Sequence, residues 1–169
     1  MQSSILQKNI TMSKILLPLI ILLGMLACKK SDCGPMPATN LDQVIFGVSY
    51  AECGGDCARN YRLTPNELFA DDCDYCYFTN IGFQTTPLPD EKFQIAKPLL
   101  ASASVPAAVV TTPDTVFGCP GCHDEGAYYL EVTKDNQKHL FRWSSDFIDI
   151  PQDLQPYFQQ VMQTLQDLQ

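Results

Sequence analysis

The sequence has few histidines and few basic residues, and it lacks the short motifs of the commonest enzyme classes. His123 and His139 are the only two histidines in 169 residues. No G-x-S-x-G, phosphate-binding loop or G-x-G-x-x-G motif occurs, so there is no ready set of catalytic parts. Eleven basic residues against nineteen acidic ones give a net charge of −8, the wrong sign for contact with a phosphate backbone. We therefore expect a protein that does not bind nucleic acid and is not an enzyme of these classes.

No apolar run reaches the length of a comfortable membrane span. The longest run, residues 15–27, reads ILLPLIILLGMLA and follows two lysines. A spanning helix needs about 20 apolar residues, whereas a secretory signal has a basic start and an apolar run of about 7 to 15. We therefore expect residues 1–27 to be a signal peptide. Met1 and Met12 both remain open as the first residue, because the segment from Met12 is itself a compact signal.

The end of this segment resembles the lipobox of bacterial lipoproteins. Ala27 stands directly before Cys28, although Met25 and Leu26 depart from the usual Leu followed by a small residue. In that family the signal is removed and the new N-terminal cysteine is lipidated. The CKKSD start at Cys28 is similar to that of many lipoproteins of the Bacteroidota, and it implies an outer-membrane destination. The resemblance implies a cell-envelope protein held on the membrane through lipid on Cys28, with periplasmic or surface orientation open.

Two further blocks are similar to uncharacterised lipoproteins of the same bacterial group. They are ECGGDC at residues 52–57 and GCPGCHDEGAYY at residues 118–129. The resemblance implies an order of strand, hairpin and closing helix, and it brings no activity with it. Without residues 1–27 the chain has nine basic and nineteen acidic residues, a net charge of −10, which favours cationic partners in a general way.

The mature chain is predicted to be a lipidated tether, residues 28–42, followed by a single disulfide-stapled domain, residues 43–169. Beta-rich runs bounded by turn residues predict strands, and a hairpin at residues 127–143. Pro98 predicts a helix from Asp90 that kinks or splits, and apolar residues at intervals of 3 and 4 predict a helix from Pro151 to the end. Residues 105–117, with two prolines, are predicted to be mostly loop. The fold class is α+β, an antiparallel sheet of a strand meander and a C-terminal hairpin packed by two helices. The predicted strands are 43–50, 60–63, 68–70, 77–83, 127–133 and 139–143.

Seven cysteines besides Cys28 predict disulfides, because an exported protein meets an oxidising compartment. Cys33 lies in the tether and is the natural odd one out, free or intermolecular. A link within a short loop restricts the unfolded chain less than a long one, so a bridge from Cys53 or Cys57 to Cys122 is the expected staple. The connectivity stays open. The six disulfide candidates are Cys53, Cys57, Cys73, Cys76, Cys119 and Cys122.

Metal and redox chemistry are the alternatives for the same cysteines. Cys73-x2-Cys76 and Cys119-x2-Cys122 have the spacing of zinc knuckles, although they lie far apart in the sequence. Cys119-Pro-Gly-Cys122 also has the spacing of a thioredoxin-type dithiol, but a strand rather than a helix is predicted to follow it.

The sharpest motif is Cys119-Pro-Gly-Cys122-His123, the C-x-x-C-H signature of c-type haem attachment. Two thioethers would form at the cysteines and His123 would be the proximal ligand, with Met162 or His139 as the sixth. The neighbouring glycine, proline and strand signals disfavour the helix on which cytochromes carry this motif. We therefore expect no cofactor and keep a metal or haem centre as the alternative function.

Two acidic clusters are interpreted as solvated turns. Asp71, Asp72, Asp74 and Glu67 have oxygen ligands for calcium but not the spacing of a calcium loop, and Asp124 and Glu125 adjoin His123. The sequence as a whole predicts a cell-envelope lipoprotein acting as a non-enzymatic binding or structural module.

Overall fold

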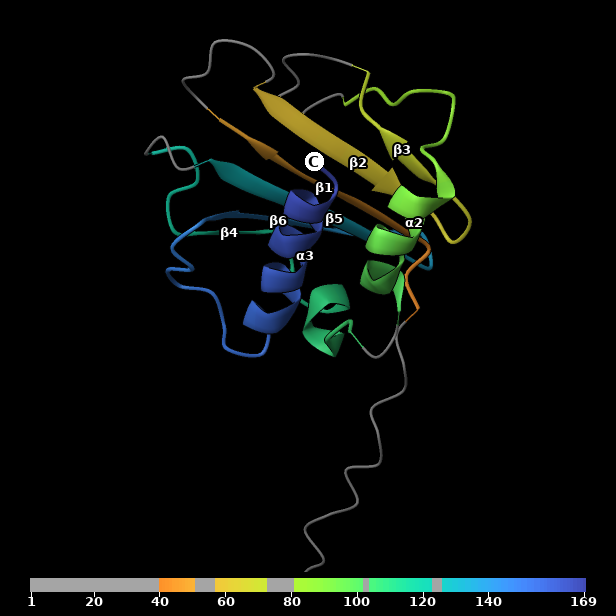
Figure 1. Cartoon of the computed structure of the whole chain (residues 1–169). Helices are drawn as coiled ribbons and strands as arrows, with labels where there is room; N and C mark the ends of the chain where they lie inside the picture. Colours follow the sequence, from red (N-terminus) through yellow and green to blue (C-terminus); the bar gives the residue numbers. More distant parts are fainter. Residues whose placement is uncertain (1–39, 51–56, 73–80, 102–103, 123–125) are drawn as a thin grey trace, which may run out of the picture. The chain divides into compact units, whose positions relative to one another are not determined.

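A computed structural model of the chain describes residues 40–50, 57–72, 81–101, 104–122 and 126–169 (Figure 1). The predicted signal peptide, Cys28 and most of the tether lie outside the described residues. No helix within the described ranges has the length and apolar character needed to cross a membrane. All the helices and strands described belong to one compact unit.

The centre of the fold is a six-stranded sheet with the order β3-β2-β1-β5-β6-β4. All neighbouring strands are antiparallel except β4 and β6, which run parallel. The predicted α+β class with its mostly antiparallel sheet is therefore confirmed, with one parallel edge strand as a difference. The strands are β1 (Gln43–Ser49), β2 (Ala58–Leu63), β3 (Leu68–Ala70), β4 (Thr115–Phe117), β5 (Ala127–Lys134) and β6 (Gln137–Ser144).

Strand β4 lies in the segment predicted to be mostly loop. It has only three residues, too few to show an alternating pattern, and Pro113 precedes it. Its pairing with β6 places Phe117 opposite Trp143. The strand therefore forms through tertiary pairing with β6 rather than from a local sequence pattern. The loop prediction is wrong for these residues.

The predicted hairpin is confirmed, with a tighter turn than expected. Lys134 pairs with Gln137, which leaves only Asp135 and Asn136 between the strands. Both turn residues are left-handed, with φ of 50° and 63°. Asp and Asn tolerate this conformation, and two such residues make the turn whose twist matches that of the flanking strands. The hairpin strands therefore extend to the turn itself.

The helices also follow the sequence signals, with shifted ends. Helix α2 (Asp90–Ala96) continues into the 3-10 helix η1 (Lys97–Leu100), so the segment splits at Pro98 as predicted. Pro89 occupies the N-cap position, and no side chain caps this helix. A second 3-10 helix, η2 (Ala107–Val110), precedes β4, and α3 (Gln155–Asp167) ends the chain.

The core lies between one face of the sheet and the helices. Figure 1 shows α2 and α3 across the same face of the sheet. Alternate residues of a strand point to one face, and Val44, Phe46 and Val48 of β1 are buried on the helix side. Phe158 of α3 packs against Trp143 and Phe141 of β6, with ring centroids 4.4 Å and 5.6 Å apart. Aromatic burial thus fixes α3 to the sheet, since its mainly glutamine outer face has little charge pairing of its own.

Candidate functional site

A cleft of about 300 Å³ lies at one end of the sheet, where three segments converge. They are the loop after β4, Gly126 directly before β5, and residues 144–149, which begin at the last residue of β6. The volume matches the lower end of known ligand pockets and fits a single side chain or a small molecule better than a large cofactor. The cleft is lined by Gly118, Cys119, Gly121, Gly126, Ser144, Asp146, Ile148 and Asp149.

The three lining glycines are required by the backbone path. Gly118, Gly121 and Gly126 have φ of 64°, 84° and 86°, a region that favours glycine. A Cβ at Gly118 would lie 2.6 Å from the Ser144 hydroxyl, so the β4 loop passes too close to the end of β6 for any side chain. These glycines therefore let the loop fold back and form the wall of the cleft.

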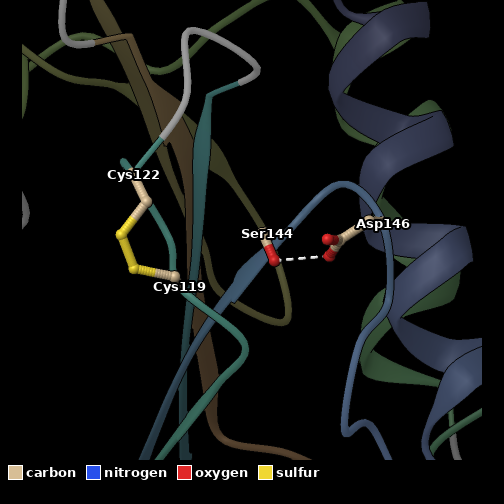
Figure 2. Close-up of a disulfide and its surroundings, with 4 residues drawn as sticks. All are labelled: Cys119, Cys122, Ser144 and Asp146. Atoms are coloured by element: carbon tan, nitrogen blue, oxygen red, sulfur yellow. Dashed lines mark hydrogen bonds between the residues drawn. A yellow bond between two sulfur atoms is a disulfide. The ribbon is translucent and has the colours of Figure 1, made fainter.

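The opposite wall is a strained segment held by one carboxylate. Phe147 and Asp149 have φ of 56° and 64°, a conformation that is costly for Phe147 and that Asp tolerates. Ser144 Oγ donates to Asp146 Oδ1 at 2.6 Å, a bond drawn in Figure 2, and the Ile148 N–H donates to the same oxygen at 3.3 Å. Asp146 therefore fixes the turn that presents Ile148 and Asp149 to the cleft.

Cys119 and Cys122 form a disulfide beside this cleft (Figure 2). Their Cα atoms are 5.5 Å apart, and the Cys122 N–H donates to the Cys119 carbonyl at 3.1 Å across a tight turn. Both cysteines are exposed. The expected long-range bridge through Cys122 is therefore wrong, because the tight turn with a left-handed Gly121 places Cys119 within bonding distance of Cys122.

Cys57 is also disulfide-bonded, and it is buried next to β2. Its partner is neither Cys119 nor Cys122, since these are bonded to each other. The remaining candidates, Cys53, Cys73 and Cys76, lie outside the described residues, as does Cys33. Every described cysteine is thus oxidised.

The residues of the haem and zinc alternatives are not brought together in the described part of the chain. Bonded to one another, Cys119 and Cys122 have no thiolate to give to zinc and no free sulfur for a thioether. His123 lies outside the described residues. His139 lies five residues before Ser144 on β6, about 16 Å from the cleft at the usual rise of a strand. Its Nδ1 is 2.8 Å from the Thr112 carbonyl oxygen, while Met162 packs against the core from α3.

The acidic residues proposed as solvated turns have local roles where they are described. Asp71 Oδ2 accepts hydrogen bonds from the backbone and side-chain amides of Asn60, at 2.9 Å and 2.7 Å. The Glu67 backbone closes a turn with Thr64. Asp74, Asp124 and Glu125 lie outside the described residues. Among the residues that are described, no three His, Cys, Asp or Glu side chains gather as metal ligands.

Tyr128 lies in β5, two residues after the cleft-lining Gly126, and its side chain is partly buried. Tyr128 stacks on Trp143 with ring centroids 5.6 Å apart. Burial raises the pKa of Tyr128, and the nearby Tyr50 raises it further. Tyr50 also lies against Gly126, where a Cβ would approach its ring to 2.9 Å. Among the described residues that line the cleft, Asp146 and Asp149 carry the charge.

The sequence did not predict this cleft. Cys119 stood out as part of a motif, whereas Ser144, Asp146, Ile148 and Asp149 did not. Their signal in the sequence was the run SSDFID, residues 144–149, between the hairpin and the final helix. It is a polar turn that interrupts the beta pattern. Nothing in that run indicates that it folds against the loop after β4.

Comparison with known proteins does not assign the chain to a family. No protein-family profile matches the chain, and no curated protein shows significant similarity to it.

Proposed function

We propose that the chain is an exported lipoprotein of the cell envelope, anchored through lipid on Cys28, whose folded domain is a binding module. The observation that carries the proposal is that Cys57, Cys119 and Cys122 are all disulfide-bonded. Disulfides persist in oxidising compartments and are rare in the cytosol. They therefore support the export that the signal-like segment and the lipobox resemblance predict.

The cleft supports binding as the role of the domain. It is preformed by a disulfide, three glycines and the Asp146 turn, so little conformational entropy is lost when a ligand enters. Among the described residues, the cleft is lined by glycines, Cys119, Ser144, Ile148 and two aspartates, a small polar and acidic surface suited to recognising a basic group. The exposed side chain of Ile148 adds an apolar contact at the rim.

Radioactive palmitate labelling of the exported full chain in a Gram-negative host tests the anchor. We expect the wild-type chain to be labelled and to stay in the membrane pellet after a high-salt wash. Cys28→Ala should be unlabelled and released. Cys33→Ala, in the same segment, is the matched control and should stay labelled. An unlabelled wild-type chain, or a labelled Cys28→Ala chain, would overturn the proposal.

A further inference from the structure

The two edges of the sheet differ in whether another described segment forms backbone hydrogen bonds with them. At the β3 edge, the Leu68 carbonyl accepts from the Leu88 N–H and the Ala70 carbonyl accepts from the Gln84 N–H, at 2.7 Å and 2.9 Å. A segment of the chain therefore covers that edge. At the β4 edge, no backbone hydrogen bond joins Thr115–Phe117 to any described segment other than β6. Proteins usually protect such edges, because an uncovered one is a template for another strand.

The backbone groups of Val116 face this open side. The Leu140 N–H donates to Asp114 Oδ1 at 2.9 Å, so the backbone of Leu140 points to the side on which β4 lies. Backbone groups alternate between the two edges of a strand, so those of Arg142 point the same way. In a parallel ladder, a residue whose backbone groups point to the neighbouring strand bonds to the residues before and after its register partner. The register partner of Arg142 is Val116, so Arg142 bonds to the residues on either side of Val116. The N–H and C=O of Val116 itself are therefore directed outward.

The side chains at this edge are also unusual. Val116 and Ile148 are 54% and 53% exposed, and they are the large hydrophobic residues exposed in the described part of the chain. Ile148 lies against Gly118, where its Cβ is 3.7 Å from the position of a glycine Cβ. Gly118 follows Val116 by two residues, about 7 Å along the chain. The open edge thus runs directly into the cleft, with an exposed apolar residue at each end.

Charge determines which group the cleft favours. Asp146 and Asp149 are its charged lining residues, on a chain whose net charge is −8. Arg142 lies beside Val116 in the sheet register and is exposed. A basic side chain is therefore favoured inside the cleft and disfavoured over the sheet next to Arg142.

We propose that the edge of β4 and the adjoining cleft bind an extended peptide segment of a partner protein. The segment adds to β4 as a seventh strand through the Val116 N–H and C=O, packs an apolar side chain on Val116, and places a lysine or arginine in the cleft beside Asp149. Main-chain pairing with side-chain pockets is a known mode of peptide recognition. This inference rests on the proposed function and names the partner class of the binding module.

A random-peptide display library screened against the exported full chain in detergent tests the inference. The expected enriched peptides contain a lysine or arginine flanked by beta-branched residues. Selected peptides are then synthesised with fluorescein, and their affinity is measured by anisotropy. A glutamate in place of the basic residue should weaken binding. Enrichment of peptides without a basic residue, or no enrichment over an empty support, would overturn the proposal.

Two variants locate the site. Val116→Pro removes the outward N–H without breaking a bond to β6, a position where edge strands tolerate proline, and it should weaken binding by about tenfold. Val116→Thr keeps the N–H and the beta-branched shape and is the matched control. Asp149→Asn keeps the shape and tolerates a positive φ, and it should reduce the preference for lysine over glutamate by about two- to fivefold. Circular dichroism verifies that each variant is folded.

Two results would contradict the inference. Peptide affinity unchanged in both folded variants would place the binding elsewhere. Concentration-dependent dimerisation that Val116→Pro abolishes, in a chain that binds no peptide, would make a second copy of the chain the occupant of the edge. Failure of palmitate labelling at Cys28 would overturn the anchor alone, so the two proposals fail separately.

Discussion

Trp143 stacks on Phe158 with ring centroids 4.4 Å apart and an angle of 22° between their planes. Both side chains are fully buried. The contact joins the end of β6 to the first turn of α3, and the segment between β6 and α3 forms a wall of the cleft. Packing of the core and placement of the cleft are thus coupled, because the ends of this segment are fixed by the aromatic pair.

Phe158→Ala should lower the free energy of unfolding by about 3–5 kcal/mol, since it removes a buried ring and leaves a cavity against Trp143 and Phe141. Urea unfolding followed by tryptophan fluorescence measures this directly, because Trp143 is the single tryptophan. Gln159→Ala, exposed on the same helix, is the control and should change stability by less than about 0.5 kcal/mol. Equal effects of the two changes would contradict the packing described.

The Tyr157 hydroxyl donates to the Leu99 carbonyl at 2.8 Å in the core. Tyr157→Phe leaves that carbonyl without its partner and should cost about 1–3 kcal/mol. Burial raises the pKa of Tyr157 above its ordinary value of 10.0. The folded state keeps the proton when the unfolded state releases it, so the contribution is complete below pH 10 and is lost as pH rises above 10.

Urea unfolding at a series of alkaline pH values tests that sign. The stability of the wild-type chain should fall above pH 10, the ordinary tyrosine pKa, and Tyr157→Phe should fall less steeply. A variant with the same slope as wild type would show that Tyr157 does not supply this pH dependence.

Gly47 lies opposite Asn60 in the β1–β2 ladder, on the face of the sheet away from the helices. A Cβ at Gly47 would overlap the Asn60 side chain and approach the Arg59 carbonyl oxygen to 2.6 Å. Gly47→Ala should therefore destabilise the chain by about 1–3 kcal/mol. The same change in an Asn60→Ala background should cost less, because one of the two overlapping groups is gone. Additive costs in thermal or urea unfolding would contradict this contact.

The Cys119–Cys122 disulfide closes a very short loop. Replacing both cysteines with alanine should therefore lower stability by only about 2 kcal/mol. Alkylation of the wild-type chain without reductant should leave Cys57, Cys119 and Cys122 unlabelled in peptide mass mapping, and reductant should make all three reactive. A Soret band together with thioether-modified Cys119 and Cys122 would contradict the disulfide.

Strong local patterns predicted most of the fold. The apolar spacing around Phe158, the beta-rich hairpin and the proline at residue 98 all have local causes, and the elements they predict are present. Strand β4 was missed because its pairing with β6 is decided by contacts more than twenty residues away. Local pattern cannot carry such information, since the sequence of three residues is compatible with many states.

The cleft was not predicted, for the same reason. The Cys119-Pro-Gly-Cys122 motif stood out in the sequence and the connectivity stayed open, but the favoured long bridge to Cys122 is wrong, because loop entropy favours long bridges only when folding brings the sulfurs together. The other wall depends on a carboxylate cap and on left-handed Phe147 and Asp149, and Phe rarely adopts this conformation. Backbone conformations imposed by tertiary packing leave no periodic signal.

Mass spectrometry of the N-terminal peptide from purified outer membranes tests the central claim most directly. The account predicts that the chain begins at Cys28 and that this residue carries a thioether-linked diacylglyceryl group and an amide-linked acyl chain. A peptide in which residues 1–27 are still joined to an unmodified Cys28 would contradict it.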